Sequence, residues 1–141
     1  MNNQIFPCMW FDGNAKAAAD FYCSVFKNSK ILDENPMVVM FELNGNKVMG
    51  LNGGPHFKFN EALSFVVNCD TQEEIDYYWE KFTADGGQES MCGWLKDKFG
   101  FSWQIVPSMI GQLMSDPAKG QRVMQAIMGM KKLDIDKLKN A

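Results

Sequence analysis

Residues 92–107 read Cys-Gly-Trp-Leu-Lys-Asp-Lys-Phe-Gly-Phe-Ser-Trp-Gln-Ile-Val-Pro, and the architecture of the chain is easiest to infer from this segment. Two aromatic-rich runs, 93–95 and 101–106, flank a charged Lys-Asp-Lys sequence that is followed by Gly100. Glycine accepts positive φ at a turn, and aromatic and β-branched residues favour strands. The segment therefore predicts a β-hairpin, with the charged residues solvated at its turn.

The first half of the chain predicts a strand, a helix and three further strands. Apolar residues at helical spacing indicate an amphipathic helix over 15–26. The sequence Asn44-Gly45 indicates a tight hairpin turn, because Asn and Gly tolerate left-handed geometry. The expected strands are residues 5–11, 30–34, 38–43 and 47–51.

The second half repeats this order before it reaches the opening hairpin. A strand over 63–67 precedes Thr71-Gln72-Glu73-Glu74, which matches a capping box at the start of a helix. The helix ends at Gly86-Gly87, and a short strand over 88–91 leads into the hairpin. About 58 residues separate Asp12 from Asp70, the residues that end the first strand of each half. The chain therefore predicts a duplicated βαβββ unit.

This duplication predicts an α+β fold in which two βαβββ repeats form curved mixed sheets around a cavity. A sheet with a helix on one face must have its other face covered, and two such faces enclose a space for a ligand. We expect one domain over residues 1–107, with repeats of about 1–58 and 59–107, and a C-terminal helical extension over 108–141. In this extension Asp116-Pro117 indicates a helix start. The apolar stripe that follows indicates core or subunit contact and consists of Val123, Met124, Ile127 and Met128.

Composition restricts the function classes. A net charge of −3 and a pI near 5.1 give no electrostatic footprint for nucleic acid. The N-terminal Met-Asn-Asn-Gln lacks signal-peptide features, and no apolar run reaches the roughly 18 residues of a membrane span, so we expect a cytoplasmic protein without membrane contact. No Cys-x-x-Cys pair occurs, so we expect free, mostly buried thiols at Cys8, Cys23, Cys69 and Cys92.

Strand alternation suggests which side chains line a cavity. Phe6, Cys8 and Trp10 share the face opposite the first helix, and the same parity in the second repeat includes Ser64 and Gln104. The candidate ligand-cavity residues are Cys8, Trp10, His56, Ser64, Trp94, Trp103 and Gln104. The alternative is that these side chains fill the core. No catalytic residue stands out, because a cysteine nucleophile at Cys8 or Cys92 would need a basic partner.

Four blocks of sequence span almost the whole chain and carry a family resemblance. They are residues 8–15 with Phe21-Tyr22, residues 51–57, residues 92–97 running on to 103–107, and residues 124–126 with 130–132. These blocks resemble the vicinal oxygen chelate superfamily, which includes glyoxalase I, bleomycin-resistance proteins and extradiol dioxygenases. More narrowly, they resemble its PhnB-like branch, often labelled 3-demethylubiquinone-9 3-methyltransferase. The resemblance implies a βαβββ fold, a homodimer and a small-molecule cavity.

The resemblance also gives positions at which to look for cofactor ligands. Metal enzymes of that superfamily use His and Glu at inward-facing strand positions, where this chain has residues 4–7, the neighbourhood of Ser64, and Gln104. The single histidine, His56, lies in a Gly-Pro loop. A neutral amide and a hydroxyl do not replace imidazole and carboxylate, so we expect no metal. Gly53-Gly54 leads to a proline and not to a helix, so we expect no S-adenosylmethionine site and no other cofactor.

We therefore expect a metal-free, dimeric, PhnB-like protein that binds or sequesters a small molecule. The residues favour binding over catalysis without deciding whether a reaction occurs. The alternatives are a metal-dependent lyase or dioxygenase, the methyltransferase of the family label, and a scaffold dimer with a fully packed interior. The ligand itself is not identified by the sequence.

Overall fold

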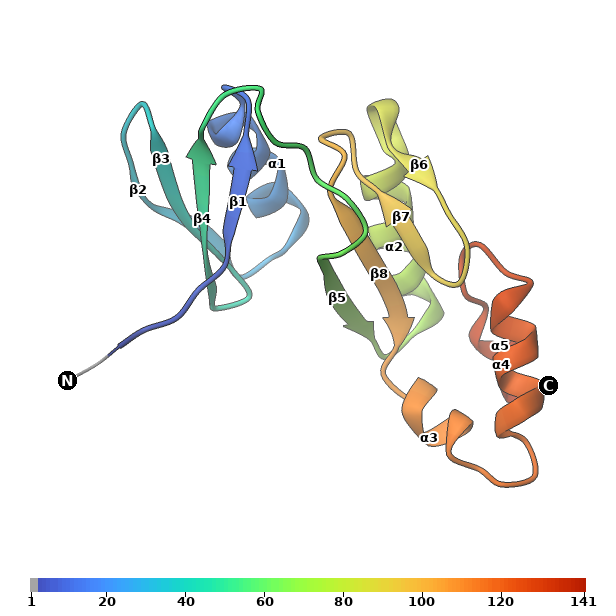
Figure 1. Cartoon of the computed structure of the whole chain (residues 1–141). Coiled ribbons are helices and arrows are strands. Elements are labelled where there is room, and N and C mark those ends of the chain that lie inside the picture. The colour runs from blue at the N-terminus through green and yellow to red at the C-terminus, as the bar shows by residue number, and fades with distance from the viewer. Residues whose placement is uncertain (1–2) are drawn as a thin grey trace. The chain divides into compact units, whose positions relative to one another are not determined.

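The computed structural model describes residues 3–141, in which two four-stranded mixed sheets each carry a helix on one face (Figure 1). Met1 and Asn2, part of the segment from which we expect no signal peptide, lie outside the described residues. The chain divides into two compact units, one ending at Phe59 and one over Asn60–Ala141. The predicted α+β fold of two βαβββ repeats followed by C-terminal helices is confirmed. Neither sheet closes into a barrel.

The first unit has the predicted element order. Its elements are β1 (Cys8–Phe11), α1 (Ala15–Val25), β2 (Ser29–Glu34), β3 (Val38–Leu43) and β4 (Asn46–Asn52). The strand order is β1-β4-β3-β2, with β1 parallel to β4 and the other pairs antiparallel. The predicted hairpin turn between β3 and β4 is confirmed, because Asn44 and Gly45 have φ values of 50° and 83°.

The core of the first unit lies between the sheet and α1. Small side chains allow the helix to approach closely: a Cβ added at Gly50 would lie 3.3 Å from the Cβ of Ala15. Alternate residues of the strands point toward α1 and are buried, whereas their neighbours remain partly exposed on the other face. The buried set consists of Met9, Phe11, Val39, Phe41, Leu43 and Val48.

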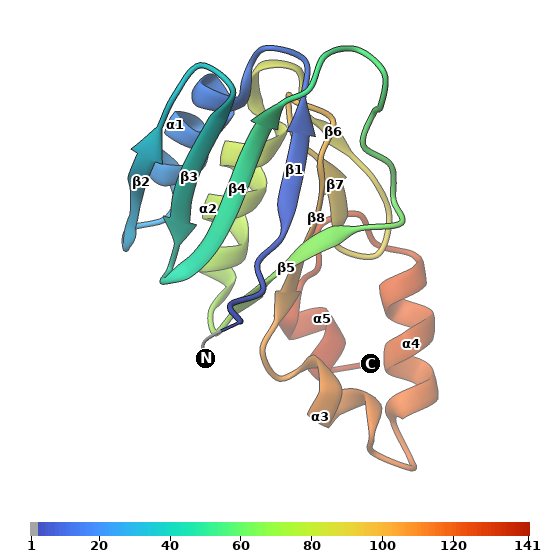
Figure 2. The same cartoon turned by 60° about the vertical axis from the view of Figure 1, so that its left-hand side comes forward.

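The second unit repeats this arrangement, with α2 in contact with β5, β7 and β8 of its sheet, and Figure 2 shows α3 following from the end of β8. Its elements are β5 (Ser64–Cys69), α2 (Gln72–Thr83), the 3-10 turn η1 (Ala84–Gly86), β6 (Gln88–Glu89), β7 (Trp94–Lys96) and β8 (Ser102–Pro107). The strand order is β5-β8-β7-β6, with β5 parallel to β8. The predicted capping box is confirmed, because the Thr71 side chain accepts from the Glu74 amide and the Glu74 carboxylate accepts from the Thr71 amide.

The opening hairpin is confirmed as β7 paired antiparallel with β8, but its turn is not solvated as expected. Asp97 is only 2% exposed. Its Oδ1 accepts from the Phe99 and Phe101 amides at 2.9 and 3.1 Å, and its Oδ2 accepts from the Trp103 indole at 2.8 Å. The expectation for Asp97 was wrong because these three donors replace the water that the carboxylate gives up.

The C-terminal segment contains α3 (Ile110–Met114), α4 (Gly120–Met128) and α5 (Ile135–Lys139). Asp116 does accept from following amides, but it organises a turn and α4 begins at Gly120, later than the sequence indicated. Val123 and Ile127 are buried within the segment, whereas Met124 and Met128 are exposed.

Backbone pairing attaches this segment to the second unit. The Cys92 amide donates to the Met130 carbonyl at 2.7 Å, and the Gly93 amide donates to the Lys131 carbonyl at 2.8 Å. The Gln72 side chain binds two further backbone groups of the segment, the Leu133 carbonyl and the Ile135 amide. Among residues 3–141, no helix is both long and apolar enough to cross a membrane.

Candidate functional site

The face of the second sheet opposite α2 carries a continuous row of polar side chains. Strand register places Gln88 beside Lys96, Lys96 beside Ser102, and Ser102 beside Ser64. Side chains alternate along each strand, so these four share one face while Leu95 and Trp103 point toward α2. We call Gln88, Lys96, Ser102 and Ser64 the polar row. It crosses all four strands of the sheet.

Hydrogen bonding within the polar row leaves one hydroxyl without a partner. Lys96 Nζ forms an ion pair with Glu61 Oε1 at 2.7 Å, and Ser64 Oγ accepts from Gln104 Nε2 at 3.0 Å. Between them, the Oγ of fully buried Ser102 has no hydrogen-bond partner in the described part of the chain. A buried polar group left in this state costs about 1–3 kcal/mol. A bound polar molecule would remove this cost.

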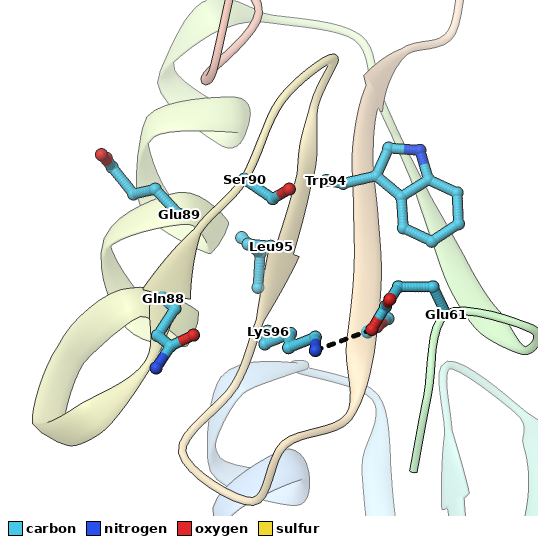
Figure 3. Close-up of a pocket in the computed structure, with 8 residues that line it drawn as sticks. Glu61, Gln88, Glu89, Ser90, Trp94, Leu95 and Lys96 are labelled. Carbon is cyan, nitrogen blue, oxygen red and sulfur yellow. Dashed lines mark ion pairs between the residues drawn. The ribbon is translucent and has the colours of Figure 1, made fainter.

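A cavity of about 230 Å³ lies over this part of the sheet (Figure 3). It is lined by Glu61, Gln88, Glu89, Ser90, Trp94, Leu95, Lys96 and Ser102. The Glu89 carboxylate accepts from the indole of Trp79 on α2 at 2.8 Å, so this acidic group is already engaged on the helix side. Pockets for drug-sized ligands measure about 300–1,000 Å³. The cavity therefore suits a smaller molecule.

The structure brings together three of the predicted site residues in the second unit and separates a fourth. Ser64, Trp94 and Gln104 share the face opposite α2, since Trp94 is the register partner of Gln104. Trp103 lies on the other face, is 2% exposed, and stacks on Phe82 with ring centroids 4.4 Å apart. Its indole donates to Asp97. The geometry places Trp103 in the core on the helix side.

The other three predicted site residues belong to the first unit. Cys8 and Trp10 lie on the sheet face opposite α1, and His56 is exposed in the turn after β4. The Trp10 indole donates to the Gly54 carbonyl at 2.9 Å. A Cβ at Gly53 would lie 2.3 Å from Trp10 Cζ2, so only glycine allows this close approach. The packing of the Trp10 ring therefore explains why glycines occur at positions 53 and 54.

The cysteines do not present an activated thiol. All four thiols are free as expected, but the expectation that they are mostly buried is wrong: Cys69 is buried, Cys23 and Cys92 are partly exposed, and Cys8 is exposed. Partial desolvation of the Cys8 thiol raises its pKa, and burial, together with Glu74 and Asp70, raises the pKa of Cys69 to about 12. A raised pKa lowers the thiolate fraction at neutral pH. Neither thiol is therefore poised for nucleophilic attack.

The residues at the expected metal positions do not fit a divalent ion. Ser64 and Gln104 hydrogen-bond to each other, and both side chains are neutral. Within residues 3–141 no three His, Cys, Asp or Glu side chains gather as a ligand set. Zinc, nickel and iron sites require charge-matched donors of these types. An S-adenosylmethionine site of the doubly wound kind also does not fit two four-stranded mixed sheets.

Sequence reasoning missed Lys96, Ser102 and Glu61 as cavity residues. Strand alternation could have identified the first two. Lys96 lies two residues after Trp94 and Ser102 two residues before Gln104, so each points to the same face of the sheet as that predicted site residue. Glu61 carries no such signal, since it precedes β5 and meets Lys96 only through the fold.

The two repeated units have the fold of the vicinal oxygen chelate class. Solved structures with the same fold include a glyoxalase-related enzyme from Fulvimarina pelagi, with 18% identity, a TM-score of 0.55 and coverage of 77% of this chain and 91% of that one. The fosfomycin resistance protein FosX from Listeria monocytogenes has 13% identity, a TM-score of 0.55 and coverage of 74% and 91%. At these identities the likeness shows the fold alone.

The family is more specific than the class. Residues 3–106 match the model of the 3-demethylubiquinone-9 3-methyltransferase family, so the chain belongs to this family. A PhnB protein from Bacillus cereus that bears the same methyltransferase label has 31% identity, a TM-score of 0.67 and coverage of 74% of this chain and 99% of that one. No curated protein matches. The predicted PhnB-like resemblance is confirmed, and α3 to α5 lie beyond the matched residues.

Proposed function

We propose that this PhnB-like protein binds or sequesters a small molecule, without a metal, at the cavity on the second sheet. The observation that carries the proposal is the buried Ser102 hydroxyl, which lines the cavity and lacks a hydrogen-bond partner among the described residues. Native proteins satisfy the large majority of their buried polar groups. A ligand that hydrogen-bonds to the Ser102 hydroxyl would explain why this group is left without a partner in the protein itself.

We also propose that the protein acts as a cytoplasmic homodimer, with residues 1–107 as one domain and 108–141 as its extension. Support for self-association comes from β5, which is an edge strand of the second sheet. Leu63 and Val66 at this edge are 50% and 53% exposed. Exposed apolar side chains beside an unpaired strand edge suit contact with a second copy. Light scattering of the purified chain tests this, and a monomer at micromolar concentration would contradict it.

The chemistry of the donors separates binding from the catalytic alternatives. A metal-dependent lyase or dioxygenase needs ligands that the neutral Ser64–Gln104 pair does not supply. The family label names a methyl transfer, but Gly53-Gly54, the glycine pair after β4, is explained by Trp10. A scaffold with a fully packed interior predicts that no ligand binds at this cavity.

A thermal-shift screen of the full chain against small metabolites and antibiotics tests the proposed function. A ligand present at a hundred times its Kd is expected to stabilise the fold by about 2.7 kcal/mol. Ser102→Ala and Trp94→Ala should abolish that shift, whereas Ser115→Ala on the exposed C-terminal segment should keep it. Absence of any stabilising ligand would contradict the proposal. Stoichiometric nickel, zinc or iron in protein purified without chelator would instead support a metal enzyme.

A further inference from the structure

We infer that the cavity on the second sheet takes a small planar monocarboxylate, which binds Lys96 and Ser102 in exchange for Glu61. This inference rests on the proposed function and names the ligand class for the same site. It follows from which cavity groups are already paired, which are not, and how they are placed on the strands.

The first argument is the placement of two hydrogen-bond donors. Lys96 and Ser102 are directly opposed residues of the antiparallel pair β7 and β8. Opposed side chains have Cβ atoms about 4.5–5.5 Å apart, so an ammonium and a hydroxyl stand side by side. A carboxylate offers two acceptor oxygens, one for each of these donors. The ammonium supplies three N–H donors, and Glu61 uses the one contact recorded at 2.7 Å.

The second argument is that a carboxylate already occupies the place beside Lys96. Glu61 lies in the turn before β5, and its side chain is mostly exposed. Ion pairs between exposed groups contribute little stability, so Glu61 is easily displaced. When a ligand carboxylate takes the place of Glu61, the Glu61 side chain turns toward solvent and Lys96 again pairs with one carboxylate. A dianion would add a second negative charge near Glu61 without a cation to balance it.

The third argument concerns the shape of the ligand. Trp94 precedes Lys96 by two positions and therefore shares its face of β7. Its indole is half-buried and lines the same cavity as Glu61 (Figure 3). Aromatic rings pack favourably against other planar groups, and a cavity of about 230 Å³ admits a single small ring. The cavity thus favours an aromatic or otherwise planar acid.

Three probes of similar shape and different charge test the ligand class: benzoate, benzamide and benzylamine. Each is titrated into the full-length protein while amide and indole NMR shifts are followed. We expect benzoate to bind at least tenfold more tightly than either of the others, with shifts at Trp94, Lys96 and Ser102. Higher salt should weaken benzoate binding and leave benzamide binding unchanged.

Four variants assign the roles. Lys96→Gln should reduce benzoate affinity at least tenfold, whereas Lys98→Gln, which removes the same charge outside the cavity, should leave it unchanged. Glu61→Gln should increase affinity severalfold, because the competing carboxylate is removed. Ser102→Ala should lower affinity and yet keep or raise Tm, because it deletes a hydroxyl that has no partner without ligand. A merely structural serine would lose stability and affinity together.

Two sets of outcomes distinguish failure of this inference from failure of the proposed function. Equal binding of benzamide and benzoate, or equal effects of Lys96→Gln and Lys98→Gln, would overturn the carboxylate class while a binding function stands. Preference for benzylamine that Glu61→Gln abolishes would overturn it in favour of a cation. No shift with any probe, together with stabilising ligands from the metabolite screen, also overturns the class alone. Absence of ligands in both experiments overturns the two together.

Discussion

The two repeats share an order of elements but differ on the sheet face that their helices leave uncovered. In the first sheet, strand register places Cys8 beside Met49 and Met49 beside Met40, a row of sulfur-containing side chains. In the second sheet the equivalent row consists of Val66, Gln104 and Trp94, and the polar row that contains Ser102 and Lys96 lies one residue pair further along the same face. The faces that pack on α1 and α2 are apolar in both.

This difference separates what the fold requires from what a ligand would require. Burying one sheet face against a helix stabilises each repeat, so both helix-facing sets must be apolar. Nothing in the fold demands a polar row with an unpartnered hydroxyl, which lowers stability. Only the second sheet has such a hydroxyl among the described residues, so we place the proposed ligand site there. The open face of the first sheet combines the sulfur row with a charged row of Lys47, Glu42 and Lys30, in which Lys30 pairs with Glu42.

The largest expected effect comes from the two tryptophans of the β7–β8 hairpin, which lie on opposite faces. Trp103→Ala should destabilise the protein by about 3–5 kcal/mol, because it removes a buried ring stacked on Phe82. Trp94→Ala should cost only about 1 kcal/mol, because that ring is half-buried, but should weaken ligand binding. Urea unfolding monitored by circular dichroism measures both.

Trp103→Phe keeps an aromatic ring at the same position and provides a version that folds if the alanine variant does not. It should lose less stability than Trp103→Ala. Equal losses of stability in Trp94→Ala and Trp103→Ala would contradict the structure, in which only Trp103 is fully buried against the helix.

The second prediction compares how each repeat closes its last hairpin. Asp97→Ala should cost about 3 kcal/mol, since it strands two buried amides and the Trp103 indole. Asn44→Ala should cost about 1 kcal/mol, because at a φ of 50° alanine lacks the local side-chain hydrogen bonding that makes asparagine tolerant of the left-handed region. Denaturant unfolding gives both values. A smaller loss at Asp97 than at Asn44 would contradict the role of the buried carboxylate.

Short-range features of the fold were predictable from the sequence for physical reasons. The capping box depends on Thr71 and Glu74, which lie within one helical turn, and the β3–β4 turn depends on Asn44-Gly45 alone. The parity that placed Cys8 and Trp10 opposite α1 follows from strand geometry. In these cases the decisive interaction joins residues that are close in sequence.

Parts of the candidate site were not predictable because the interacting residues are far apart in the sequence. Glu61 meets Lys96 across 35 positions, and no local pattern indicates that pairing. The burial of Asp97 depends on the indole of Trp103, which belongs to the far strand of the hairpin. Trp103 is different: as the neighbour of Gln104 in a strand, it had to face the other way, so alternation was sufficient to separate them.

The third prediction tests the aromatic surface of the first repeat. Gly53→Ala should displace the Trp10 ring, whose Cζ2 lies 2.3 Å from the position of the new Cβ. Loss of the indole hydrogen bond to Gly54 should cost about 1 kcal/mol and shift the Trp10 indole signal in NMR. Gly111→Ala in α3, where an added Cβ meets nothing within 4 Å, is the control and should be neutral or slightly stabilising. An unchanged Trp10 signal would contradict the close packing.

The smallest effect concerns the attachment of the C-terminal segment, which only the second repeat carries. Lys132 Nζ lies 2.7 Å from Asp76 Oδ1 on α2. Hydrogen bonds from Lys132 and then Gln72 lower the pKa of Asp76 from its ordinary 3.8. The carboxylate therefore contributes stability above about pH 3.8, and this contribution is lost as the pH falls through the lower folded pKa. Both side chains are partly exposed, so the contribution is below about 1 kcal/mol.

Asp76→Asn should thus lower stability slightly at pH 7 and flatten the loss of stability between pH 5 and pH 2. Hydrogen exchange at the amides of Cys92, Gly93 and Ile135, which donate to Met130, Lys131 and Gln72, should become faster in this variant at pH 7. Asp20→Asn removes a similarly exposed carboxylate from α1 and controls for net charge. If both variants accelerate exchange at these three amides equally, the local ion pair does not hold the segment. If only Asp76→Asn does, the attachment is specific to the second repeat, as the comparison of the two repeats requires.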